Sequence, residues 1–159
     1  YKLNSMKFAR GKKIKCFLGA VTPVAKKNEI SKVYKFNRTW SDLDTLDKNF
    51  ADKINKELNI NYREEEIELI DINDLFSKLP HINFLNIDVE GIDEQLIMSL
   101  NLKIYNPDVI VLEDNTWGGS SEIRQKMYEF NYRLFFISGN SLGFAKETKK
   151  NNFLNEFNL

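Results

Sequence analysis

Short runs of apolar residues, separated by polar and turn-forming residues, divide the chain into predicted strands and helices. Brief apolar or alternating runs are typical of strands, whereas apolar residues spaced by three or four are typical of helices. The predicted strands are residues 14–21, 30–36, 64–70, 82–89, 109–112, 132–138 and 142–146. Helices are predicted within residues 37–61, from Asp71 or Asn73 to Pro80, from Gly91 to Leu100, and over residues 122–131.

The strands predicted at residues 82–89 and 109–112 are apolar almost throughout, and a predicted helix follows each of them. This pattern indicates a parallel sheet whose two faces are both covered by helices. The last two strands flank Gly139-Asn140 and are expected to form an antiparallel hairpin. Because no repeat or linker interrupts the pattern, we expect one α/β domain over residues 1–159, with a mostly parallel sheet and a terminal antiparallel hairpin.

Charge and residue usage narrow the range of functions. Lys+Arg and Asp+Glu are equal at 23 each, whereas proteins that bind nucleic acid or anionic membranes usually carry a basic excess. Neither is therefore an expected partner. Cys16 and His81 are the single cysteine and histidine, which argues against disulfides, cysteine zinc sites and most histidine mechanisms. With no long apolar run or secretory leader, we expect a cytoplasmic protein, and a homo-oligomer is left open.

Acidic and amide side chains follow the two apolar strands: Asp88 and Glu90 follow the first, and Glu113, Asp114 and Asn115 follow the second. Open α/β sheets bind ligands at the carboxyl ends of their strands, and the ends of neighbouring strands lie about 5 Å apart. Mg²⁺ prefers such oxygen ligands, and a carboxylate beside it can take the proton of a substrate hydroxyl. The alternative is that these residues cap helices and loops or are simply solvated.

The segment after the second of these strands, residues 114–120, contains Trp117 and the pair Gly118-Gly119. Glycine permits hinge geometry, and an aromatic ring can stack on a sugar. Trp117, with Glu113 at the strand end, is therefore a candidate substrate-binding residue. An ordinary connecting loop is the alternative.

Several segments together form a recognisable signature. The most specific is NFLNIDVEG at residues 83–91, an apolar strand that ends in Asp-Val-Glu-Gly before a helix. PDVIVLE at residues 107–113 is a Pro-led apolar strand ending in Glu, and residues 131–134 begin a late Tyr-led strand. Weaker matches are FLGAV at residues 17–21 and ELIDINDL at residues 68–75. From about residue 15 to residue 146, the chain resembles the FkbM-type methyltransferases.

This resemblance implies a Rossmann-like class I methyltransferase fold, S-adenosylmethionine as the methyl donor, and O-methylation of a sugar, glycan or related small molecule. It also implies roles for individual residues. Asp88 would lie near the methyl-donor sulfur and the acceptor, and Glu90 would support it as a second catalytic candidate. Gly19 and Ala20 would lie near the adenine edge of the cofactor.

A second, smaller similarity concerns a metal. Asp114 and Asn115 look like the Asp-Asn pair that completes the Mg²⁺ site of catechol O-methyltransferase-like enzymes, with Asp88 as the third ligand. Mg²⁺ is therefore a second candidate cofactor.

One part of the family pattern does not precede Ile14. The family begins with a strand, a Gly-rich loop and a helix, followed by an acidic residue that binds the ribose, and Gly11 and Gly19 form no G-x-G motif. We therefore expect a partial domain whose N-terminal strands are missing and are supplied by a longer chain or a partner. Two other functions stay open. They are a metal-dependent nucleotide-sugar glycosyltransferase using Asp88-Val89-Glu90 as a D-x-D-like clamp, and a non-catalytic module that retains the fold.

Overall fold

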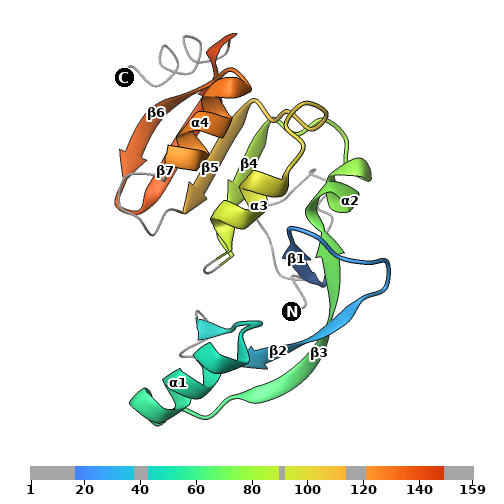
Figure 1. Ribbon diagram of the computed structural model, residues 1–159, viewed down its shortest axis with the longest axis vertical. Helices are drawn as coiled ribbons and strands as arrows, with labels where there is room; N and C mark the ends of the chain where they lie inside the picture. Colours follow the sequence, from blue (N-terminus) through green and yellow to red (C-terminus); the bar gives the residue numbers. More distant parts are fainter. Residues whose placement is uncertain (1–16, 38–42, 90–91, 114–120, 149–159) are drawn as a thin grey trace, which may run out of the picture.

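The computed structural model describes residues 17–37, 43–89, 92–113 and 121–148. Within these ranges the chain forms two sheets, with strand orders β1-β3-β2 and β4-β5-β7-β6 (Figure 1). The strands are β1 Ala20–Thr22, β2 Ile30–Lys35, β3 Arg63–Asp71, β4 Phe84–Ile87, β5 Val109–Glu113, β6 Tyr132–Ser138 and β7 Ser141–Lys146. The helices are α1 Lys48–Leu58, α2 Ile72–Ser77, α3 Asp93–Ser99 and α4 Ser121–Glu129.

The expectation of one mostly parallel sheet is wrong. Among the described strands, β4–β5 and β1–β3 pair in parallel, whereas β2–β3, β5–β7 and β6–β7 are antiparallel. The physical reason lies in the hairpin of β6 and β7, which was correctly expected. Its second strand inserts beside β5 instead of lying at the edge, and residues 142–145 of β7 are all buried as in a central strand.

Helices α3 and α4 both lie on one face of the four-stranded sheet (Figure 1). The core between them and the sheet follows the predicted periodicity, because Leu96, Ile97 and Leu100 are at most 1% exposed. Ile123 and Met127 of α4, one helical turn apart, are buried in the same core. The expected helical cover on both faces is not seen for the described helices, and Phe84 and Asn86 of β4 are exposed.

The first predicted strand pairs over fewer residues than its apolar run suggests. Within the strand predicted at residues 14–21, the sheet begins at Ala20, and Phe17 and Leu18 are exposed. The β1 ladder with β3 spans three residue pairs and stops at Thr22↔Asp71, because α2 begins directly after Asp71. The carboxylate of Asp71 accepts hydrogen bonds from the first backbone amides of that helix, so of the two predicted caps it is Asp71 that caps α2.

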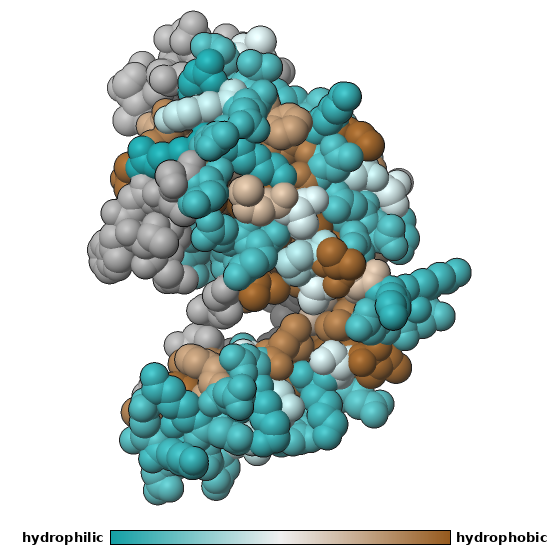
Figure 2. All heavy atoms as spheres, in the orientation of Figure 1, coloured by the Kyte–Doolittle hydropathy of each residue, from teal (hydrophilic) through white to brown (hydrophobic). Residues whose placement is uncertain are grey.

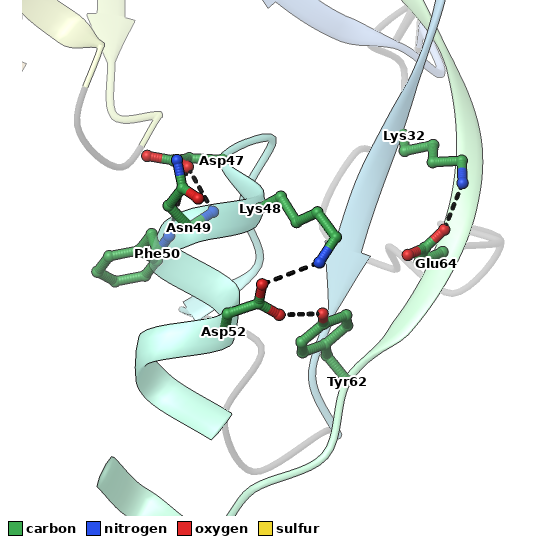
Figure 3. A network of polar contacts seen from close by, with 8 residues as sticks. All are labelled: Lys32, Asp47, Lys48, Asn49, Phe50, Asp52, Tyr62 and Glu64. Atoms are coloured by element: carbon green, nitrogen blue, oxygen red, sulfur yellow. Dashed lines mark hydrogen bonds and ion pairs between the residues drawn. The ribbon is translucent and has the colours of Figure 1, made fainter. Parts of the chain in front are cut away.

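A smaller lobe is built from α1, β2 and the first part of β3 (Figure 1). Its core is a separate apolar cluster centred on Tyr34, Phe36 and Ala51. Figure 3 shows that Asp52 of α1 accepts hydrogen bonds from the Lys48 ammonium at 2.8 Å and the Tyr62 hydroxyl at 2.5 Å. These two bonds hold the pKa of the Asp52 carboxyl below its usual value, and the bond from Tyr62, the residue before β3, attaches α1 to the strand pair.

Exposed apolar side chains gather around β1 and the start of β2. They are Phe17, Leu18, Val24 and Ile30, each more than half exposed. Figure 2 shows apolar surface at the middle of the molecule, between the four-stranded sheet and a lobe whose visible surface is mostly hydrophilic.

The first prediction follows from the close packing of β6 against β7 at Gly143. A Cβ at Gly143 would overlap the ring of Phe136 on the neighbouring strand. We therefore expect Gly143→Ala to lower the free energy of unfolding by about 1–3 kcal/mol, measured by chemical denaturation. Phe136→Leu in the Gly143→Ala background should recover part of the loss, and strictly additive effects in this double-mutant cycle would contradict the contact.

The second prediction concerns the fully buried Tyr132, which begins β6. Its hydroxyl donates a 2.6 Å hydrogen bond to the carbonyl of Pro107, and burial raises the pKa of that hydroxyl above its usual value. Tyr132→Phe leaves a buried carbonyl without this partner, so we expect a loss of about 1–2 kcal/mol in thermal or chemical unfolding. Tyr128→Phe on the exposed side of α4 is the matched control and should change little.

Candidate functional site

The carboxyl ends of β4 and β5 lie side by side. Their parallel register runs from Phe84↔Val109 to Ile87↔Leu112, so Asp88, the first residue after β4, and Glu113, the last residue of β5, lie at the same edge of the sheet. The sequence left open whether these two strands are neighbours, and the structure shows that they pair directly. Open α/β sheets bind ligands at this edge, and we take it as the candidate site.

Asp88 is exposed and makes no hydrogen bond or ion pair with another described residue. Its backbone follows Ile87, which is 5% exposed, so a free carboxylate stands directly beside a buried strand end. This combination leaves the charge available to a ligand. Other predicted site residues, namely Glu90, Asp114, Asn115 and Trp117, lie outside the described residues, so their roles stay predictions.

Glu113 is tied to the hairpin turn of β6 and β7. Because β7 runs antiparallel to β5 with Glu113 opposite Ser141, the turn before Ser141 lies at the same sheet edge. There the Asn140 amide donates a hydrogen bond to Oε1 of Glu113. Oε2 of Glu113 is buried without a hydrogen-bond partner among the described residues. One oxygen of the predicted substrate-binding carboxylate is thus held, while the other remains unsatisfied.

The predicted cofactor contacts Gly19 and Ala20 lie in the other sheet, at the beginning of β1. A Cβ at Gly19 would overlap the Ile70 side chain of β3 and lie 3.1 Å from the Glu68 carbonyl oxygen. Close packing of β1 on β3 therefore accounts for glycine at this position. Whether Gly19 and Ala20 also contact a cofactor stays a prediction.

Asp93 is the residue at this site that sequence reasoning missed. It begins α3, is 4% exposed, and accepts a 3.2 Å hydrogen bond on Oδ1 from the backbone amide of Val89. Its Oδ2 is buried and has no hydrogen-bond partner among the described residues. An acidic residue in the first turn of a predicted helix can be recognised in the sequence. Such residues are usually exposed to solvent, and the sequence does not reveal that this one is buried.

The described residues contain no group of three or more His, Cys, Asp or Glu side chains placed to hold a metal ion. The predicted Mg²⁺ set includes Asp88 together with Asp114 and Asn115, which are not described. The Mg²⁺ site therefore stays a prediction.

A hollow of about 240 Å³ lies at the opposite edge, near the amino ends of β4 and β5, and is lined by residues that include His81, Ile82 and Pro107. The carboxylate beside it, Asp108, accepts a 2.9 Å hydrogen bond from the amide of Asn83 and already interacts with cationic side chains. This hollow is therefore a weaker candidate than the carboxyl edge. The His81 side chain is at the surface, 54% exposed.

The described residues form a mixed α/β fold with acidic residues at the carboxyl ends of a parallel strand pair, the edge at which open α/β sheets bind ligands. Residues 12–134 match the family model described as the methyltransferase FkbM domain. Because this match covers well over half of the chain, the chain belongs to the FkbM methyltransferase family and is an S-adenosylmethionine-dependent methyltransferase. The curated proteins and the solved structures contain no match to it. Of the described helices, none is long and apolar enough to cross a lipid bilayer.

The third prediction follows from the hydrogen bond between Asn140 and Glu113. Asn140→Asp places a second carboxylate beside Glu113, so we expect a loss of about 2 kcal/mol of stability near pH 7 from the lost bond and the repulsion. The loss should shrink as the pH falls through the carboxyl range, because protonation of either group removes the repulsion. Asn140→Ala is the control, since it removes the bond without adding charge. An equal pH dependence for the two variants would contradict the contact.

Proposed function

We propose that the chain methylates a hydroxyl group of a sugar, glycan or related small molecule, with Asp88 as the residue that orients and deprotonates the acceptor. The observation that carries this proposal is the exposed carboxylate of Asp88 at the end of β4, which has no partner among the described residues. It lies within the residues that match the methyltransferase family.

The carboxylates at this edge of the sheet fit a positively charged cofactor. S-adenosylmethionine supplies a methyl group on a positively charged sulfur, and a carboxylate is the natural partner of such a cation. The exposed Asp88 carboxyl group has no ion-pair partner among the described residues. The buried, unsatisfied Oε2 of Glu113 is a second acceptor at the same edge, suited to a hydroxyl donor on the substrate.

In the proposed reaction, Asp88 accepts a hydrogen bond from the acceptor hydroxyl and holds its oxygen in place. The oxygen bonds to the methyl carbon as the sulfur–methyl bond of S-adenosylmethionine breaks, which leaves S-adenosylhomocysteine, and the proton of the oxygen passes to the Asp88 carboxylate and then to water. A carboxylate is a weak base, so the proton leaves late, as positive charge develops on the oxygen. Most of the acceleration then comes from holding the acceptor in line with the methyl group.

The remaining predicted residues have supporting roles in this proposal. Glu90 supports Asp88, and Trp117 stacks on the acceptor ring. A Mg²⁺ ion held by Asp88, Asp114 and Asn115 would lower the pKa of the acceptor hydroxyl. No feature of the described residues favours the nucleotide-sugar transferase or the non-catalytic module over methyl transfer.

The fourth prediction is cofactor binding. Calorimetric titration of the 159-residue chain with S-adenosylhomocysteine, with and without Mg²⁺, should give saturable one-to-one binding. A well-folded chain that does not bind would overturn the proposal for this chain. Tighter binding or faster turnover with Mg²⁺ than without it would support the metal site.

Asp88→Asn tests the proposed base. We expect this variant to bind S-adenosylhomocysteine and to keep its melting temperature, because Asp88 is exposed. Release of S-adenosylhomocysteine with a panel of saccharide and phenolic acceptors should slow by about 100-fold or more. The matched control is Asp74→Asn, the same substitution at an exposed position on α2, and it should be as active as the unchanged chain. Unchanged turnover in Asp88→Asn would remove Asp88 from the mechanism.

A further inference from the structure

Asp93 is the most deeply buried carboxylate among the described residues. It is 4% exposed, whereas Asp88, five residues earlier, is exposed. Burial of a carboxylate is costly unless hydrogen bonds and nearby positive charge compensate for lost water. The hydrogen bond that compensates this burial therefore indicates what the Asp93 side chain does.

The interactions that offset the burial of the Asp93 carboxylate connect it to the candidate site. Its place in the first turn of α3 puts the carboxylate near the positive end of that helix, and the capping residue Ile92 makes no side-chain bond of its own. Oδ1 accepts the hydrogen bond from the Val89 amide at 3.2 Å. The described contact of the Asp93 side chain is therefore with the backbone that leaves β4.

The position of that contact matters because Val89 directly follows Asp88. On the other side of Asp88, Ile87 is the last strand residue and is buried in the core. Asp88 thus lies between one residue held by core packing and sheet pairing and another held by Asp93. Two fixed neighbours restrict the backbone of Asp88 and the directions available to its side chain.

We propose that Asp93 is a positioning residue for the methyltransferase site, holding Asp88 in place through the Val89 amide. This inference rests on the proposed function of Asp88. Asp93 itself contacts no reacting atom. It acts because a loss of alignment at the acceptor slows in-line transfer strongly.

Two substitutions separate the hydrogen bond from the charge. Asp93→Asn keeps an oxygen that can accept from Val89, whereas Asp93→Ala removes it. The matched control is Asn73→Ala, because the Asn73 side chain bonds the backbone at the other end of α3, donating to the Ser99 carbonyl and accepting from the Asn101 amide. Loss of those bonds weakens α3 without touching the strand that carries Asp88.

We expect Asp93→Ala to lower kcat by about 10- to 100-fold at saturating cofactor and acceptor. Asp93→Asn should stay within about threefold of the unchanged chain, because the bond to Val89 survives. Asn73→Ala should melt earlier and keep its kcat. If Asp93→Ala keeps the unchanged kcat, or if Asp93→Asn is as slow as Asp93→Ala, the positioning role is wrong.

Hydrogen exchange at the Val89 amide tests the inference without any turnover. The amide should be protected in the unchanged chain, in Asp93→Asn and in Asn73→Ala, and should exchange faster in Asp93→Ala. If the Val89 amide is equally protected in all four proteins, the proposed restraint of Val89 by Asp93 is wrong. The exchange pattern can be as expected while S-adenosylhomocysteine does not bind. In that case the proposed function is wrong, but the hydrogen bond by which Asp93 fixes the end of β4 is confirmed.

Discussion

The parallel pairing of β4 with β5 is the constraint on which the candidate site depends. The register that ends at Ile87↔Leu112 places two buried residues opposite each other, 5% and 0% exposed. A slip of one residue would turn one of them away from the core, so the apolar pattern of the strands resists it. Asp88 and Glu113 therefore lie at the same edge of the sheet because the residues before them must be buried.

Helix α3 connects that strand end to the rest of the core. At its beginning, Asp93 contacts the Val89 amide. At its end, the Lys126 ammonium of α4 donates to the Met98 and Leu100 carbonyls at 2.7 and 2.9 Å. The apolar side of the helix is fully buried between these contacts, so the turn that carries Asp88 is attached to an element held at both ends.

The parts of this structure that the sequence predicts are those that depend on local pattern. The positions of β4, β5 and α3 follow from apolar runs and from the spacing of Leu96, Ile97 and Leu100, although the strand at residues 82–89 is shorter than predicted. Sheet order does not follow, because the pairing of β7 with β5 joins segments far apart in the chain. In the candidate site, Asp88 stands out by its place after an apolar strand. Asp93 and Asn140 read as an ordinary helix start and turn, and tertiary contacts alone reveal their roles.

The central place of β7 has a consequence for how the chain folds. During synthesis, β5 emerges about thirty residues before its antiparallel neighbour, so one of its edges stays open until residues 141–146 are made. Pairing over such a separation pays a loop-closure cost before its contacts are gained, and open strand edges invite association with other chains. Completion of the four-stranded sheet therefore waits until β7 has been made, and synthesis that stops short of residue 141 leaves β5 with one unpaired edge.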